Sequence, residues 1–146
     1  MARLAKDIMT PKPACCTPET TVEEVARMMV RNDCGEIPVL DNTNRVIGVV
    51  TDRDIVCRIV AAGRNPMGLS VRDCMSQPVV TIRDDASLDE VMSAMEKHQI
   101  RRVPVVTDGG TCAGIISQAD LARTGPERKV AELLNEVSQK AGPAVH

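Results

Sequence analysis

The chain contains no phenylalanine, tyrosine or tryptophan among its 146 residues. Proteins that stack single-stranded bases on aromatic rings are therefore excluded, and a bound purine would have to lie against aliphatic side chains, methionine, cysteine or backbone. The formal net charge is −2 and no stretch is polybasic, so nucleic-acid binding has no electrostatic support.

Long hydrophobic runs are missing as well. The longest apolar runs stop well short of the ~18 residues that would suggest a membrane span, and Met1–Asp7 lacks the apolar run of a signal peptide. We therefore expect a soluble, cytoplasmic protein that does not contact a membrane. The apolar fraction of 43% and the charged fraction of 26% are typical of a globular chain.

Motifs for catalysis and for tight metal binding are also absent from the sequence. There is no G-x-S-x-G, no Walker-type loop and no C-x-x-C pair among the six cysteines, and the only histidines are His98 and His146. We expect no enzyme activity, no required cofactor and no metal site.

The sequence does contain an internal repeat. A shift of 66 residues, which brings Asp7 onto Asp73, aligns the two halves without a gap as far as Ile55 and Leu121. A half of ~60 to 70 residues buries little surface alone, so the two halves are expected to share one core. The identical pairs are Asp7/Asp73, Met9/Met75, Glu24/Glu90, Val25/Val91, Met29/Met95, Pro38/Pro104, Val39/Val105, Gly48/Gly114 and Asp54/Asp120.

Each repeat is predicted to fold in the order β-α-β-β-α. The first helix begins after Thr21 or Ser87, each followed three residues later by a glutamate at the capping-box spacing, and it carries an amphipathic stripe. The second helix of the first repeat begins at Thr51, carries Ile55, Val56, Ile59 and Val60, and ends by Gly63. The predicted strands are Ala14–Thr17, Ile37–Leu40 and Val46–Val50 in the first repeat, and Val79–Ile82, Val103–Val106 and Ala113–Ile116 in the second.

This arrangement resembles the CBS domain pair, or Bateman module, and most closely its stand-alone bacterial forms. The resemblance rests on Asp7-Ile8-Met9, Glu36-Ile37-Pro38-Val39, Gly48-Val49-Val50-Thr51-Asp52-Arg53-Asp54 and their counterparts in the second repeat. It implies an α/β fold of two tandem repeats packed with pseudo-two-fold symmetry. We expect repeat 1 at residues 4–63, a linker at 64–69, repeat 2 at 70–123, and a C-terminal helix and tail at 124–146, the helix with the stripe Val130, Leu133, Leu134 and Val137.

The same resemblance implies an adenine-nucleotide site at the motif G-h-h-[TS]-x-x-D. In CBS domains like this one, the aspartate binds the ribose hydroxyls and the threonine or serine contacts ribose or phosphate. The matching residues are Thr51 and Asp54 in the first repeat, and Ser117 and Asp120 in the second. The alternative is that these residues only cap their helices, because Ser/Thr-x-x-acid is also a capping pattern.

The remaining predicted site residues fall into a phosphate group and an adenine group. Arg53, Arg101 and Arg102 would neutralise phosphates in one cleft between the repeats, whereas Glu36 would make the opposite cleft poorer for phosphate. The alternative is that the arginines are ordinary solvated residues. The apolar adenine contacts would come from Ala14, Cys15, Cys16, Val80, Thr81 and Ile82, flanked by Ile37 and Val103.

Two functions remain open on the sequence. The first is a regulatory module that binds AMP, ADP, ATP, NAD or S-adenosylmethionine between its repeats and signals to an unidentified protein partner. The second is an interaction or scaffold protein that keeps the fold without binding a nucleotide. Apolar helix faces also predict a homodimer with closed two-fold symmetry.

The cysteines are mostly expected to be packing residues. Cys34, Cys74 and Cys112 align with apolar positions of the other repeat, and Cys57 is predicted on the buried stripe of a helix. Only the adjacent pair Cys15-Cys16 keeps some potential for redox or metal chemistry.

Overall fold

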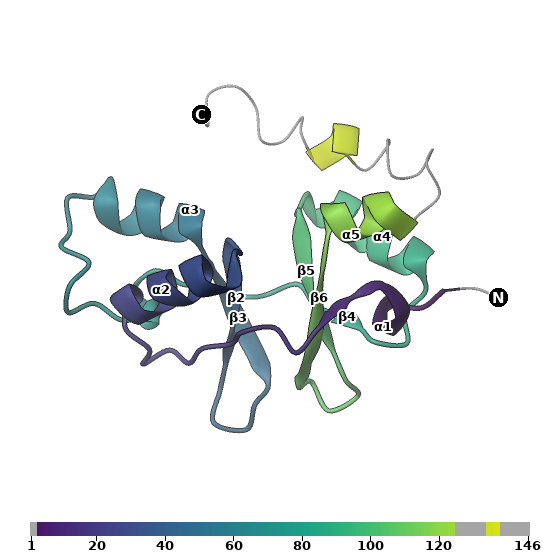
Figure 1. The fold of residues 1–146 in the computed structure, drawn as a ribbon, viewed down its shortest axis with the longest axis horizontal. Coiled ribbons are helices and arrows are strands. Elements are labelled where there is room, and N and C mark those ends of the chain that lie inside the picture. Colours follow the sequence, from purple (N-terminus) through teal and green to yellow (C-terminus); the bar gives the residue numbers. More distant parts are fainter. Residues whose placement is uncertain (1–2, 125–133, 138–146) are drawn as a thin grey trace. The chain divides into compact units, whose positions relative to one another are not determined.

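A computed structural model describes residues 3–124 and 134–137 of the chain (Figure 1). These residues form two compact units. The α2 unit consists of Pro13–Val79 with Gly109–Cys112, and the α4 unit of the chain up to Lys12, Val80–Asp108, and the chain from Ala113 onward. No helix among the described residues is long and apolar enough to cross a membrane.

The α2 unit is built around an antiparallel hairpin with helices packed against it (Figure 1). Two short segments extend the hairpin: Cys16 bridges Val39 in parallel, and Ser76 bridges Val49 in antiparallel orientation. Buried residues from the hairpin, the helices and these segments form one core cluster. The regular elements are α2 (Val22–Asn32), β2 (Glu36–Leu40), β3 (Val46–Thr51), α3 (Asp52–Ile55), a π-helical turn at Val56–Val60 and a 3-10 turn at Val71–Asp73.

The α4 unit contains a four-stranded sheet in the order β1-β6-β5-β4. Strand β4 runs parallel to β5, and β1 pairs antiparallel with β6, Thr10 lying opposite Ile115. A second core cluster fills this unit. Its elements are α1 (Ala5–Ile8), β1 (Thr10–Pro11), β4 (Ile82–Arg83), α4 (Leu88–His98), β5 (Arg102–Val106), β6 (Cys112–Ser117) and α5 (Gln118–Thr124).

The prediction of one shared core is wrong, since the buried residues form two clusters. Each cluster instead includes buried residues from a segment of the other repeat of the sequence. Ala5 and Ile8 are buried in the α4 unit, and the repeat-equivalent residues Val71 and Cys74 are buried in the α2 unit. This exchange gives each small half apolar surface that its own repeat could not supply.

Two glycines make the exchange possible. A Cβ added to Gly48 would lie 2.8 Å from both Met75 Cε and the Ser76 carbonyl oxygen. A Cβ added to Gly114 would lie 2.5 Å from Met9 Sδ and 2.7 Å from the Thr10 carbonyl oxygen. The glycine of the repeated motif is therefore required by the close approach of a backbone from the other repeat.

The predicted helices α2 and α4 are confirmed, with Thr21 as the N-cap of α2 and Ser87 as the N-cap of α4. Thr21 Oγ1 accepts from the Glu24 N–H at 3.1 Å, and Ser87 Oγ accepts from the Glu90 N–H at 3.2 Å. Glu24 does not complete the capping box, because its carboxylate instead forms an ion pair with Arg31 at 2.7 Å.

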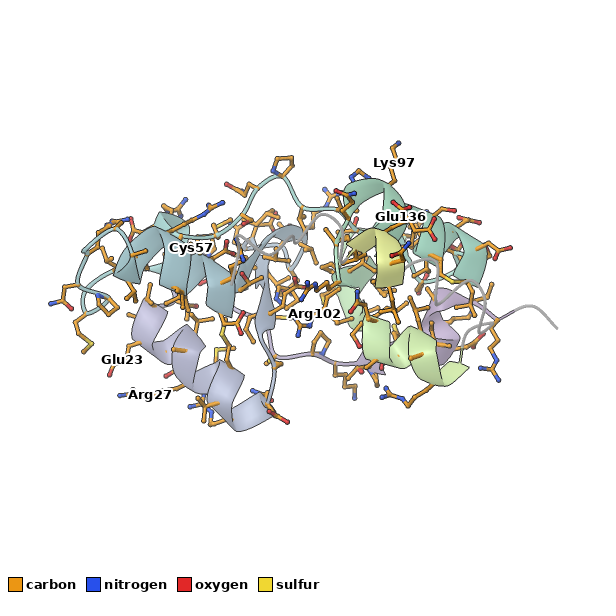
Figure 2. All side chains as sticks on the ribbon, turned by 90° about the horizontal axis from the view of Figure 1, so that it is seen from above. Glu23, Arg27, Cys57, Lys97, Arg102 and Glu136 are labelled. Atoms are coloured by element: carbon orange, nitrogen blue, oxygen red, sulfur yellow. The ribbon has the colours of Figure 1, made fainter. Side chains whose placement is uncertain are left out.

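Two details of the second helix differ from the prediction. Ile59 is buried as expected, but Val56 and Val60 are 55% and 58% exposed, and Cys57 is exposed (Figure 2). The segment Val56–Val60 is π-helical, with the Ala61 N–H donating to the Val56 carbonyl at 2.8 Å. This wider helical turn changes the spacing of the apolar side chains, and only Ile55 and Ile59 of the predicted stripe pack against the core. Gly63 ends the segment as predicted, with φ at +75°.

The predicted C-terminal helix lies mostly outside the described residues. Residues 134–137 are helical, and Val137 is buried in the core of the α4 unit, whereas Leu134 is 37% exposed.

Candidate ligand-binding site

The first predicted site residues lie where β3 ends and α3 begins. Thr51 Oγ1 accepts a hydrogen bond from the Asp54 N–H at 3.0 Å, and Asp54 Oδ2 accepts one from the Thr51 N–H at 3.0 Å. This is a complete capping box. The capping role that the sequence offered as the alternative to ligand binding is therefore present in the structure. Thr51 suits this junction because it has a β-branched strand side chain and a capping hydroxyl.

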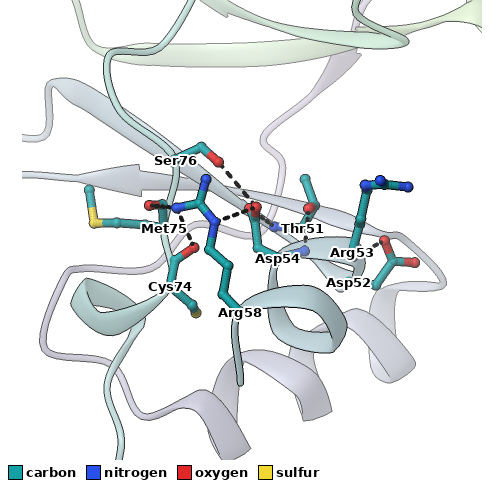
Figure 3. A network of polar contacts seen from close by, with 8 residues as sticks. All are labelled: Thr51, Asp52, Arg53, Asp54, Arg58, Cys74, Met75 and Ser76. Carbon is teal, nitrogen blue, oxygen red and sulfur yellow. Dashed lines mark hydrogen bonds and ion pairs between the residues drawn. The ribbon is translucent and has the colours of Figure 1, made fainter. Parts of the chain in front are cut away.

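Capping does not account for all the contacts of the Asp54 carboxylate (Figure 3). Its Oδ1 atom accepts a hydrogen bond from Ser76 Oγ at 3.1 Å and lies 3.7 Å from Arg58 Nε. Arg58 is itself held, because Nη1 donates to the Met75 carbonyl at 3.0 Å. The Asp54 side chain is only 12% exposed, and this surrounding shell of donors keeps its negative charge compensated.

The second repeat builds the same junction with different partners. Ser117 caps α5 by accepting from the Asp120 N–H at 3.2 Å, and Asp120 Oδ2 accepts from the Ser117 N–H at 2.9 Å. The other carboxylate oxygen of Asp120 forms an ion pair with Arg123. Asp120 is 5% exposed, and it is the one buried charged side chain among the described residues.

Both junctions therefore present a nearly buried, hydrogen-bonded carboxylate at the end of a strand. A carboxylate offers about four acceptor positions, and it can bind two neighbouring hydroxyl groups such as those of a ribose. Ligand hydroxyls would have to join, or displace, the donors that already surround Asp54 and Asp120.

The predicted phosphate-binding arginines are exposed. In the α2 unit the Arg53 guanidinium points away from the Asp54 network (Figure 3). In the α4 unit the Arg101 carbonyl accepts a hydrogen bond from the Gln118 N–H at 3.1 Å. The segment before β5 thus lies beside the Ser117 junction of its own repeat, and the sharing of a cleft between Arg101, Arg102 and the Thr51 junction remains a prediction.

The corresponding segment of the α2 unit has the same backbone contact. The Gly35 carbonyl accepts from the Asp52 N–H at 3.0 Å, and Glu36 lies opposite Thr51 in the hairpin register. Ile37, the next residue of β2, is fully buried in the core. In the α4 unit Val103 of β5 is fully buried in the same way.

The predicted adenine contacts are half-buried, with the exception of Cys16. Val80 and Ile82 pack against the core of the α4 unit, and Thr81 between them is half-buried. Ala14 packs against the core of the α2 unit, beside half-buried Cys15 and buried Cys16. Ala14, Cys16, Val80 and Ile82 therefore have the packing role expected of them, and binding of adenine by this group of residues remains a prediction.

Sequence reasoning missed two residues that contact the first carboxylate, Ser76 and Arg58. Ser76 aligns with Thr10 at the 66-residue offset, and the hydroxyl that follows Met9 and Met75 in both repeats was the available signal. Arg58 is four residues after Asp54, which is an ordinary ion-pair spacing on a helix.

The adjacent cysteines Cys15 and Cys16 face different partners. The Cys15 thiol is hydrogen-bonded to Cys112, and this contact, with burial, raises the Cys15 pKa far above its usual range. Burial raises the pKa of Cys16 to about 12, and the neighbouring Cys74 thiol adds to the effect. Burial also raises the pKa of Cys74, which is 1% exposed as a packing residue should be.

The family model for the CBS domain matches this chain twice, at residues 5–61 and 71–127. The chain therefore belongs to the CBS domain family and contains a tandem pair of its domains, as the sequence predicted. It is 32% identical to hypoxic response protein 1 of Mycobacterium tuberculosis over 133 residues, which are 91% of this chain and 92% of that protein. It covers only 56% of the length of another relative, an uncharacterised protein of Methanopyrus kandleri.

Solved structures of CBS pairs share the fold. Hypoxic Response Protein I with two coordinated zinc ions is 34% identical, with a TM-score of 0.77 over 85% of this chain and 100% of that one. The CBS pair of MJ0100, in complex with 5′-methylthioadenosine and S-adenosyl-L-methionine, is 26% identical, with a TM-score of 0.75 over 84% and 95%. CBSX2 in complex with AMP is 25% identical, with a TM-score of 0.70 over 82% and 93%.

Proposed function

We propose that this CBS pair is a regulatory sensor of an adenosine-containing ligand and has no catalytic activity. The observation that carries the proposal is the duplicated strand–helix junction with a nearly buried carboxylate, Asp54 in one repeat and Asp120 in the other. The ligands of the similar CBS pairs, AMP in one and 5′-methylthioadenosine with S-adenosyl-L-methionine in another, share an adenosine moiety.

In this proposal each aspartate accepts hydrogen bonds from the ribose hydroxyls. Thr51 and Ser117 contact the ribose or phosphate, and Arg53, Arg101 and Arg102 neutralise phosphate charge. The half-buried segments around Cys15 and Thr81 supply the apolar surface for adenine, since the sequence has no aromatic ring for stacking. Binding regulates a protein partner if the ligand has different affinities for two conformations.

We further propose that the chain forms a homodimer through the helical face of the α2 unit. Val30 is 82% exposed and Met67 57% exposed, and both line an apolar groove of about 540 Å³ between α2 and the segment after α3. The rim of the groove carries the ion pair of Arg27 with Glu23 (Figure 2). A rim with both charge signs is complementary to a second copy of itself under two-fold symmetry.

Light scattering tests the homodimer. The expected result is twice the chain mass of 15.8 kDa at micromolar concentration, with dissociation by Val30→Glu, which leaves the buried face of α2 intact. The matched control is Arg53→Glu, a change at an exposed residue that does not line the groove. A wild-type chain that stays at 15.8 kDa contradicts the dimer.

A second candidate function is a scaffold that binds no nucleotide. It is favoured by one observation, the complete set of internal donors around Asp54, which would satisfy the carboxylate without a ligand. A direct measurement of nucleotide binding distinguishes the sensor from the scaffold.

Calorimetry with AMP, ADP, ATP, NAD and S-adenosylmethionine separates them. We expect at least one of these ligands to bind the wild type. We expect Asp54→Asn to lower the affinity for that ligand by about tenfold or more, because a hydrogen bond to a charged group contributes ~1.5–3 kcal/mol. Asp52→Asn is the matched control, since it makes the same charge change at an exposed position of the same helix. If no ligand binds the wild type at millimolar concentration, the sensor proposal fails.

A further inference from the structure

The two segments that meet at Cys15 and Cys112 are held together by backbone contacts. The Lys12 N–H donates to the Ala113 carbonyl at 3.3 Å, which continues the antiparallel pairing of β1 with β6. Cys112 is the residue before Ala113 and the first residue of β6, and Cys15 lies three residues after Lys12. Both cysteines belong to the α2 unit, so their contact lies within one compact body.

The two thiols have a defined arrangement. The Cys15 thiol donates to the Pro13 carbonyl at 3.3 Å, and its other hydrogen-bond partner is the Cys112 thiol. Both side chains are half-buried, so small solutes can reach them. The neighbouring Cys16 is 5% exposed and lies in the core with Cys74, so it does not compete for Cys112.

This pair is unlike a metal site in the part of the chain that the structure describes. No group of three or more His, Cys, Asp or Glu side chains there is arranged to hold a metal ion. Two thiols in hydrogen-bond contact can instead be oxidised to a disulfide.

We propose that Cys15 and Cys112 form a reversible intramolecular disulfide with a small-molecule disulfide such as oxidised glutathione as the oxidant. The thiolate of one cysteine attacks the oxidant, forms a mixed disulfide and releases one glutathione. The second cysteine then attacks the protein sulfur of that mixed disulfide and releases the other glutathione. Two protein thiols lose two electrons, one oxidised glutathione gains them, and both thiol protons end on the two glutathione molecules.

The bond would tie the segment that precedes α2 to the start of β6, two segments 97 residues apart (15 to 112). Closing so large a loop restricts the unfolded chain, so the oxidised protein should melt at a higher temperature. The raised pKa of Cys15 keeps the thiol protonated at neutral pH, so the reaction should accelerate as the pH rises. This inference does not depend on whether a nucleotide binds.

Mass spectrometry of the full chain after treatment with oxidised glutathione tests the proposal. We expect a loss of two hydrogen masses, a tryptic link to the Cys112 peptide, which contains no other cysteine, and reversal by dithiothreitol. The link should persist in Cys16→Ala and disappear in Cys15→Ser, where Cys112 should carry glutathione instead. Thermal melting under reducing conditions checks that both variants fold.

Three results overturn the proposal. They are a link from Cys112 to a residue other than Cys15, a link between two chains on a non-reducing gel, and glutathione adducts at Cys15 and Cys112 that never resolve into a disulfide. Exposed Cys57 serves as the internal control, because it should acquire glutathione in every variant and so report that the oxidant was active.

Discussion

The Ser76 hydroxyl donates a hydrogen bond to Asp54 Oδ1 at 3.1 Å, although the two residues belong to different CBS domains of the sequence. Asp54 ends the G-h-h-[TS]-x-x-D motif of the first domain, and Ser76 lies in the segment of residues 71–79 that the second domain contributes to the α2 unit. The carboxylate proposed to bind ribose is thus positioned partly by the exchanged segment.

Substitution of Ser76 tests how much that positioning matters. Ser76→Ala should lower the free energy of unfolding by about 0.5–1.5 kcal/mol, the usual net contribution of a hydrogen bond. Thr10→Ala is the matched control, since Thr10 is the exposed repeat equivalent. A double-mutant cycle with Asp54→Asn, measured by chemical denaturation, should show that the two changes are not additive. Strict additivity would contradict coupling between the two side chains.

The glycines that accept the exchanged segments give a second prediction. Gly48→Ala and Gly114→Ala should each destabilise the fold by about 1–3 kcal/mol, because the new methyl group would overlap a backbone carbonyl oxygen. Gly109→Ala is the control, since a Cβ there meets nothing within 4 Å. Urea denaturation of the three variants checks the ranking, and equal stabilities would contradict the close approach.

Much of the fold could be predicted from the sequence because its local signals agree. The helices and hairpins could be predicted from the caps Thr21 and Ser87, the apolar periodicity and the turn residues. The same signals occur in both repeats, so each prediction was supported twice. The segment exchange could not be predicted in this way. The two repeats have equivalent residues at Met9 and Met75, so pairing within a repeat and pairing between repeats satisfy the same pattern.

The candidate site was predictable only in part. Thr51, Asp54, Ser117 and Asp120 share a motif and lie together as expected. Arg58 reaches Asp54 only because the chain continues as a helix beyond α3, and Cys15 reaches Cys112 only through the pairing of β1 with β6. The i,i+4 spacing of Asp54 and Arg58 permits an ion pair but does not single it out, and the contact of Cys15 with Cys112 depends on tertiary structure alone.

The buried thiols predict a loss of stability at alkaline pH. The usual pKa of a cysteine is near 9.0 and that of folded Cys16 is about 12, so both folded and unfolded chains are protonated below pH 9. Between these values only the unfolded chain releases the proton, and the free energy of unfolding should fall by on the order of 1 kcal/mol per pH unit.

Denaturation of Cys16→Ala at several pH values, with a reductant present, checks the sign and the source of this slope. The variant should lose less stability than the wild type between pH 9 and pH 11. Val39→Ala is the control, because Val39 is buried beside Cys16 and has no titratable group, so its effect should be the same at both pH values. A wild-type slope that survives in Cys16→Ala would assign the effect to other groups.

The last prediction concerns the charge of the ligand and rests on the proposed sensor function. If Arg102 neutralises phosphate, Arg102→Ala should weaken the binding of ATP by about tenfold and leave the binding of adenosine nearly unchanged, since adenosine has no phosphate. Asp54→Asn should weaken the binding of both ligands, because both contain the ribose. Arg27→Ala is the matched control: it removes an exposed arginine from the α2 helix and should change neither affinity (Figure 2).

Calorimetry at two salt concentrations should also show that ATP binding to the wild type weakens with salt more than binding to Arg102→Ala does. Equal losses for ATP and adenosine in Arg102→Ala would mean that Arg102 supports the fold or contacts the nucleoside, and the assignment to phosphate would be wrong.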